Sequence, residues 1–281
     1  MTTTTANPTA FVLGGGGKWG AVEVGMLHAL VDAGIRPDLI VGTSIGAVNG
    51  AMFAADPTAS GIETMRGLWH EVMESDMFSA KVWERVRSLT RMRVAIQDAA
   101  PLRDMLERSL PVDRIEDLTI RFECVAASIQ RAAEHWFDRG PLVDALLASS
   151  AVPTLFPPVE IDGQHFYDGG LVDSVPIDRA VALGAKRVYV LQVGRIEQPL
   201  RPPTKFWEPA ILAFEIARRH RFVRANDEAP DGVELHLLPS ANDVGFDDPR
   251  QAKWTDMSET AALLDGAYAA SADYLRAAGP S

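Results

Sequence analysis

The apolar positions in the first 55 residues fall into two kinds of pattern. Residues 10–13 and 39–42 are continuous runs of apolar or small residues, as expected for strands buried on both faces. Residues 20–33 and 45–55 instead place apolar and small side chains at helical spacing, and Gly34 provides a stop for the first helix. Strand, helix, strand and helix joined by short connections predict parallel neighbouring strands.

Further along the chain, the same two patterns predict more elements. The sequence indicates a mainly helical insertion at about 61–110, then an antiparallel strand pair at 119–129 and 133–138. A helix is expected at 141–149, later strands at 186–193 and 233–238, and a closing helix at 256–277. Core candidates in the insertion are Trp69, Met73, Val82, Trp83, Val86 and Met105. Because no repeat or composition break divides the chain, we expect a disordered tail at 1–9 and one domain at 10–281, ending in a helical extension at about 206–281.

The composition is that of a globular protein with a core, since 47% of the 281 residues are hydrophobic and 23% are charged. The net charge of −11 argues against nucleic acid as a partner and gives no general attraction to anionic membranes. The single cysteine, Cys124, lies in a strand-like run where a small buried residue is expected, and one cysteine forms no intrachain disulfide. The N-terminus lacks the pattern of a signal peptide, and no apolar run is long enough to span a bilayer. We therefore expect a cytoplasmic protein, with peripheral membrane contact left open.

The most informative motif is Gly-Thr-Ser-Ile-Gly at residues 42–46, directly after the apolar run 39–41. It falls between a predicted strand and a predicted helix, so Ser44 occupies a sharp turn that lifts its hydroxyl out of the backbone. This geometry is typical of a serine nucleophile. Such a nucleophile needs a group that accepts its proton and an oxyanion hole.

A run of four glycines at 14–17 follows the first strand and leads through Gly20 into the first helix. Glycines at this turn let backbone N–H groups point outward together beside a helix N-terminus, which makes a site for negative charge. Adjacent parallel strands end at the same edge of a sheet, so this loop and Ser44 should meet. The expected oxyanion donors are the backbone N–H groups of Gly15, Gly16 and Gly17.

The loop also matches the G-x-G-x-x-G pattern of dinucleotide-binding folds, through Gly15, Gly17 and Gly20. That hypothesis predicts an acidic residue at the end of the second strand, whereas Asp38 precedes the apolar run. A Walker loop requires Ser or Thr after its lysine, and here Trp19 follows. The oxyanion hypothesis explains the loop and the serine together, and a nucleotide-binding, Rossmann-like protein is the alternative.

None of the six histidines has a sequence context that marks it as the base for Ser44. His165, in a predicted turn, is a reserve candidate, and His236 alternates with two leucines, so we expect it to face solvent. The stronger candidate is the Asp168-Gly169-Gly170 turn, where two glycines can bring the carboxylate against another backbone. An aspartate with a pKa of about 4 is a poor base for a hydroxyl, but it becomes workable when desolvated beside an oxyanion hole.

Together, the glycine loop, the G-x-S-x-G elbow and the D-G-G turn resemble the patatin-like phospholipase family. The resemblance extends over about 11–193 and includes 25–30 after the loop, 49–51 after the elbow and 148–153 before the aspartate. It implies a three-layer α/β/α sandwich with a mostly parallel central sheet. It also implies a dyad of Ser44 as nucleophile and Asp168 as base, without histidine. The implied oxyanion donors are Gly15, Gly16 and Gly17, and the implied supporting residues are Gly20, Gly42, Gly46, Gly169 and Gly170.

Two positions depart from the family pattern. Trp19 stands where the family usually has Arg or Lys before the last glycine of the loop. Residues 173–176 read Asp-Ser-Val-Pro, where the family often has asparagines before a proline. The first departure bears on how the loop is braced and on the head group it favours.

The resemblance implies a serine lipid acyl hydrolase of the phospholipase A or esterase type, which acts on a lipid or ester substrate without a metal or other cofactor. A non-catalytic lipid-binding relative is a second alternative, and the intact serine, aspartate and glycines argue against it. Residues 208–224 have an apolar half followed by four arginines, which favours a docked helix over one that contacts membranes. The sequence indicates no particular oligomeric state.

Overall fold

The computed structural model describes residues 7–74, 99–153, 155–193, 232–241 and 257–279, with isolated positions between 200 and 220. Within them, a sheet of eight strands has the order β5-β6-β3-β2-β1-β7-β8, and β4 pairs with β3 outside that order. The strands are β1 (Thr9–Leu13), β2 (Leu39–Thr43), β3 (Arg121–Ser128), β4 (Ala133–Phe137), β5 (Val159–Ile161), β6 (Gln164–Asp168), β7 (Arg187–Leu191) and β8 (Glu234–Leu238). From β3 to β8 in this order neighbours are parallel, whereas β4, β5 and β6 pair antiparallel.

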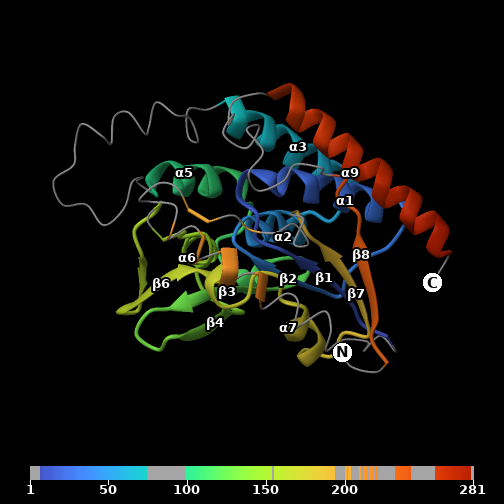
Figure 1. Cartoon of the computed structure of the whole chain (residues 1–281). Coiled ribbons are helices and arrows are strands. Elements are labelled where there is room, and N and C mark those ends of the chain that lie inside the picture. Colours follow the sequence, from blue (N-terminus) through green and yellow to red (C-terminus); the bar gives the residue numbers. More distant parts are fainter. Residues whose placement is uncertain are drawn as a thin grey trace.

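Helices cover both faces of the sheet (Figure 1). On one face lie α1 (Ala21–Asp32), α2 (Ile45–Ala55), α3 (Ala59–Glu74), α5 (Ala100–Ser109), α6 (Leu142–Ser149) and α9 (Met257–Ala278). Helix α7 (Ile177–Ala182) packs on the other face. This is the expected three-layer α/β/α arrangement, with antiparallel strands added beside a parallel centre. None of the helices in the described ranges is both long and apolar enough to cross a membrane.

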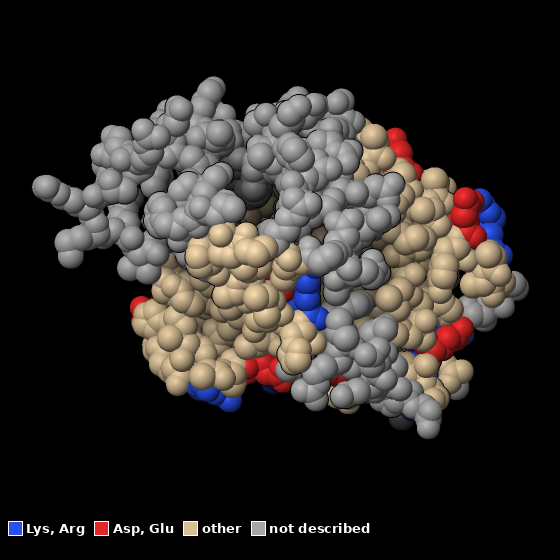
Figure 2. Space-filling view, viewed as in Figure 1, with Lys and Arg blue, Asp and Glu red and all other residues tan. Residues whose placement is uncertain are grey.

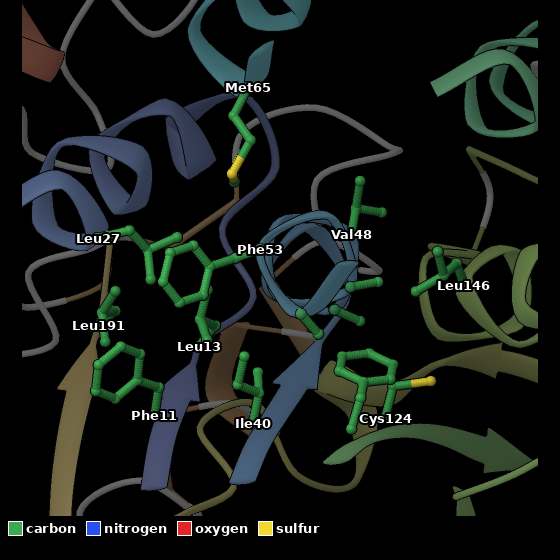
Figure 3. Packing of buried hydrophobic residues seen from close by; sticks show 14 of the residues in the cluster. Phe11, Leu13, Leu27, Ile40, Val48, Phe53, Met65, Cys124, Leu146 and Leu191 are labelled. Atoms are coloured by element: carbon green, nitrogen blue, oxygen red, sulfur yellow. The ribbon is translucent and has the colours of Figure 1, made fainter. Parts of the chain in front are cut away.

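The two cores follow from the alternation of side chains along the central strands. Phe11 and Leu13 of β1 point toward the larger helical layer, where they join a cluster that includes Phe53 of α2 (Figure 3). Ala10 and Val12 point the other way and join a smaller cluster with α7. Because β1 is buried on both faces, its run of apolar residues is continuous, as the sequence indicated.

Two strands, β2 and β6, pair one after the other with the same edge of β3. β4 pairs with Cys124–Ser128 and so occupies one edge of β3. The other edge is taken by β2, which lies beside Arg121–Val125, and by β6, which lies beside Ala126–Ser128. Since β2 is parallel to β3 and β6 is antiparallel to it, the carboxyl ends of β2 and β6 face each other along this edge.

The register on β3 fixes which residues meet at this junction. Thr43, the last residue of β2, lies opposite Val125. Asp168, the last residue of β6, lies opposite Ala126, the next residue along β3. Ser44 directly follows Thr43, so the junction places it beside Asp168.

Most predicted elements are confirmed, but the region between 150 and 183 differs from the prediction. The sequence analysis placed no helix or strand there and put His165 in a turn, whereas the structure contains β5, β6 and α7, with His165 on β6. These elements are only three to six residues long, too short to establish a clear periodicity. At the N-terminus, Thr9 belongs to β1 and not to the predicted tail. Cys124 is fully buried as expected, and burial raises the pKa of its thiol well above the usual range.

The predicted helical insertion is described at its two ends only. Helix α3 begins it and α5 ends it, with Trp69 buried and Met105 partly buried against the core. Positions 75–98, with the candidates Val82, Trp83 and Val86, lie outside the described residues, as does the side chain of Met73. The segment 208–224 also lies largely outside them.

The C-terminal extension contributes a strand as well as a helix, because β8 pairs with β7 and α9 packs on α1. The prediction that His236 faces solvent is wrong. Its side chain is buried and stacks on Tyr189 of β7, with ring centroids 4.6 Å apart, while Leu237 is exposed. The alternation of β8 was recognised correctly, but Tyr274 of α9 covers the face that carries the histidine.

The crossing of α1 and α9 gives a test of the fold. A Cβ atom at Gly25 would lie 2.2 Å from the Leu264 carbonyl oxygen of α9. We predict that Gly25→Ala lowers the free energy of unfolding by about 1–3 kcal/mol, because the added methyl group forces the helices apart. Chemical denaturation measures the change.

Gly67 of α3 provides a matched control. No described heavy atom lies within 4 Å of the position of its Cβ atom. Gly67→Ala should therefore raise the free energy of unfolding by up to about 1 kcal/mol, through helix propensity alone. Equal effects of the two alanines would contradict the close crossing of α1 and α9.

Candidate functional site

Ser44 occupies a strained turn between β2 and α2. Its backbone has φ 55° and ψ −126°, a conformation that costs a residue other than glycine about 1–3 kcal/mol. The carbonyl group of Ser44 accepts a hydrogen bond from the Ala47 N–H at 2.9 Å, which starts α2. Its own N–H donates to Ser149 Oγ, also at 2.9 Å. These contacts hold the turn in place, and Ser44 lies at the positive end of the α2 dipole.

The glycines of the elbow are required by close packing. A Cβ atom at Gly46 would lie 2.5 Å from the Leu13 carbonyl oxygen at the end of β1. A Cβ atom at Gly42 would lie 2.6 Å from Ala47 Cα. Neither position has room for a side chain, so α2 can start directly against the ends of β1 and β2.

Asp168 is fully buried and touches Ser44 directly. Ser44 Oγ donates a hydrogen bond to Asp168 Oδ2 at 2.5 Å. The other carboxylate oxygen, Oδ1, accepts from the Gly170 N–H at 2.7 Å. A Cβ atom at Gly169 would lie 2.3 Å from the Val125 carbonyl oxygen, so the D-G-G turn packs tightly on β3. The structure therefore brings the predicted nucleophile and the predicted base into hydrogen-bond contact.

The glycine loop lies beside the same elbow, but its three predicted donors are not equivalent. A Cβ atom at Gly15 would lie 3.4 Å from Ser44 Cβ, which places the loop against the serine. The Gly15 N–H, however, donates to the Ser174 carbonyl oxygen at 2.9 Å. The expectation that this N–H is an oxyanion donor is therefore not supported, because a bond to a distant segment already uses it. Gly16 and Gly17 follow it, and Gly17 has a φ of 58°, which favours glycine.

The residues after the D-G-G turn hold the loop and the elbow through their backbone. The Asp173 carbonyl oxygen accepts from Thr43 Oγ1 at 2.8 Å, and the Ser174 carbonyl oxygen accepts from Gly15. Because carbonyl groups make both contacts, the departure from the family pattern at these positions leaves them intact. At the other departure, the Trp19 side chain packs against the larger core. Beside it, a Cβ atom at Gly20 would lie 2.4 Å from Ile45 Cγ1.

The reserve candidate His165 is not part of this site. It lies on β6, three residues before Asp168, so its side chain points to the opposite face of the strand. There it is partly exposed and pairs with Gln130 at 2.9 Å. The sequence analysis missed Ser149, which supports the elbow. Its only sequence signal is the segment 148–153, which was noted as a resemblance without a role.

Ser149 and Ser150 form a natural matched pair for an experiment. Ser149→Ala leaves the Ser44 N–H buried without an acceptor, so it should lower the free energy of unfolding by about 1–3 kcal/mol. Ser150 Oγ is buried without a hydrogen-bond partner in the described structure, so Ser150→Ala should change that free energy by no more than about 0.5 kcal/mol. Chemical denaturation of both variants measures the difference, and similar losses would contradict the role of Ser149.

The chain is similar to several known proteins. The chain is 35% identical over 200 residues to "Patatin-like phospholipase domain-containing protein ZK370.4" of Caenorhabditis elegans, a match that covers 69% of this chain and 14% of that protein. It is 30% identical over 189 residues to "Lysophospholipase nte1" of Aspergillus terreus, covering 66% of this chain and 12% of that protein. The matched part is thus about one seventh or less of each relative.

Among solved structures, the chain is similar to VipD from Legionella pneumophila, with 13% identity and a TM-score of 0.48, covering 98% of this chain and 68% of that one. The family model described as patatin-like phospholipase matches residues 11–181, which include the glycine loop, Ser44 and Asp168. This chain therefore belongs to the patatin-like phospholipase family.

Proposed function

We propose that the protein hydrolyses carboxylic ester bonds of lipids, with Ser44 as nucleophile and Asp168 as its base. The observation that carries the proposal is the 2.5 Å hydrogen bond from Ser44 Oγ to Asp168 Oδ2, made at a strained turn beside a glycine loop. Membership of the patatin-like phospholipase family supports a lipid ester as the substrate. The name of one relative, a lysophospholipase, adds lysophospholipids to the candidate substrates.

In the proposed reaction, Ser44 Oγ attacks the ester carbonyl carbon while its proton passes to Asp168 Oδ2. The carbonyl oxygen becomes an oxyanion, and the C–O bond to the alcohol then breaks. Asp168 returns the proton to the leaving alcohol oxygen, which leaves the acyl group on Ser44. Water attacks this acyl-enzyme in the same way, giving up its proton to Asp168, and the released serine oxygen takes that proton back.

The surroundings of Asp168 suit this role. The carboxylate is fully buried, so no bulk water competes for the hydrogen bond with the hydroxyl. The Gly170 N–H holds Oδ1 and leaves Oδ2 for Ser44. No histidine takes part in this arrangement among the described residues.

For the oxyanion we propose the backbone N–H groups of Gly16 and Gly17. The N–H of Gly15 is engaged by Ser174 and anchors the loop. The N-terminus of α2 adds the favourable end of a helix dipole near Ser44. Each such donor contributes about 3 kcal/mol to lowering the barrier in enzymes that use an oxyanion hole.

The nucleotide-binding alternative has less support from the structure. Asp38 precedes β2 and accepts a hydrogen bond from the Thr9 N–H at 2.8 Å. Thr9 is the first residue of β1, so Asp38 lies at the opposite edge of the sheet from the glycine loop. A carboxylate there is far from the place where a ribose bound beside the loop would lie.

The prediction of peripheral membrane contact has no electrostatic support from the described surface in Figure 2. On that face, basic and acidic residues are scattered among uncharged ones and form no broad basic patch.

The decisive experiment is a hydrolysis screen with short esters, long esters, phospholipids and lysophospholipids. Ser44→Ala and Asp168→Asn should each lower kcat/KM at least about a thousand-fold, because each removes one half of the proposed dyad. Circular dichroism establishes that both variants are folded.

Labelling with a fluorophosphonate probe separates an enzyme from a lipid-binding relative. The wild-type protein should react at Ser44, identified by mass spectrometry, and Ser44→Ala should not. Hydrolysis that persists in a folded Ser44→Ala protein would overturn the proposal, as would an unlabelled wild-type protein with no hydrolysis.

A further inference from the structure

Glu23, in the first turn of α1, is a buried carboxyl group that the proposed reaction does not use. Its side chain is fully buried, and Oε2 accepts a hydrogen bond from Asn49 Nδ2 at 2.7 Å. Oε1 has no hydrogen-bond partner in the described structure. Burial raises the pKa of Glu23 well above its usual range, although the hydrogen bond from Asn49 opposes the rise.

Asn49 connects this carboxyl group to three other elements. Its Nδ2 also donates to the Gly20 carbonyl oxygen at 2.9 Å, and its Oδ1 accepts from Trp69 Nε1 of α3 at 3.0 Å. Both amide hydrogens and the amide oxygen are thus engaged, so the orientation of Asn49 is fixed. Asn49 itself lies on α2, the helix that begins directly after Ser44.

The hydrogen bond from Asn49 to Gly20 holds the end of the glycine loop. The loop begins at Gly14 and Gly15, whose N–H groups are anchored to the Leu191 and Ser174 carbonyl oxygens. It ends at Gly20, which Asn49 holds. Gly16 and Gly17 carry no side chains, so their position depends on the residues on either side of them: the anchored start of the loop, and Trp19, which packs against the larger core, with Gly20 after it. The N–H groups proposed as oxyanion donors, on Gly16 and Gly17, lie between them.

We propose that Glu23 is a positioning residue, which orients Asn49 and thereby fixes the far end of the glycine loop relative to Ser44. This inference rests on the proposed function, because it concerns the placement of the oxyanion donors. The role requires an acceptor at the distance of Oε2 and does not require an acidic proton. Glu23→Gln retains that acceptor. Glu23→Asp has a side chain one methylene group shorter, which moves the acceptor away from Asn49, and Glu23→Ala removes the acceptor.

The experiment measures kcat and KM for ester hydrolysis and the rate of fluorophosphonate labelling of the three Glu23 variants. We expect Glu23→Gln to stay within about twofold of wild type. We expect Glu23→Asp and Glu23→Ala to lower kcat and the labelling rate by about ten- to a hundred-fold with KM changed less than threefold, because misplacement by about 1 Å has an effect of this size. If Glu23→Ala fails to fold, the comparison of Gln with Asp decides.

Gly25→Ala is the control for a general loss of stability, because Gly25 lies on the same helix and the atoms nearest to its Cβ position belong to α9. It should destabilise the protein and leave kcat within about twofold. A folded but inactive Glu23→Gln would overturn the proposal, since it would indicate proton transfer by the carboxyl group. Full activity in both Glu23→Asp and Glu23→Ala would also overturn it, as would an equal loss of kcat in Gly25→Ala.

Ser44→Ala, measured alongside, keeps the two proposals distinct. Activity that survives in Ser44→Ala contradicts the proposed function. Activity that is lost in Ser44→Ala but unchanged in Glu23→Ala contradicts the positioning role alone.

Discussion

The site depends on one edge of β3, which β2 and β6 share end to end. Parallel pairing brings Thr43 to Val125, and antiparallel pairing brings Asp168 to Ala126. A shift of β6 by one residue would turn the Asp168 side chain to the other face of the sheet. The hydrogen bond between Ser44 and Asp168 is therefore set by strand register, and the tight packing of Gly169 on β3 helps to hold that register.

The other contacts of the site keep a strained serine at this junction. The Ser44 backbone is held by Ser149 from α6 and by the first turn of α2, while Gly46 lets that turn rest on β1. The glycine loop is fixed by Ser174 at its start and by Asn49 at its end. Strain at Ser44 is thus offset by its own hydrogen bonds to α6, to the first turn of α2 and to Asp168, an arrangement often found where backbone strain has a function.

Local features of the site could be predicted from the sequence, and long-range ones could not. Ser44 and its flanking glycines predict a strand-to-helix turn, because the residues that such a sharp turn requires all lie within five positions of the chain. The use of the Gly15 N–H by Ser174 could not be foreseen, since the two residues are far apart in sequence and the contact is made by a carbonyl group. Asp168 was identified from its motif, but not the strand that carries it, because β5 and β6 are too short to show a period. His236 shows a further limit of prediction from the sequence. The alternation of residues in β8 indicates that the strand has two different faces, but the packing of α9 decides which face is buried.

The segment matched by the family model ends at 181, before β7 begins. Yet the Leu191 carbonyl oxygen, at the end of β7, accepts the hydrogen bond from the Gly14 N–H that starts the glycine loop. A chain trimmed to the matched segment would leave that N–H without its acceptor and would open the edge of β1 along its whole length. The end of the family-model match is therefore not the end of the folded unit, which includes at least β7.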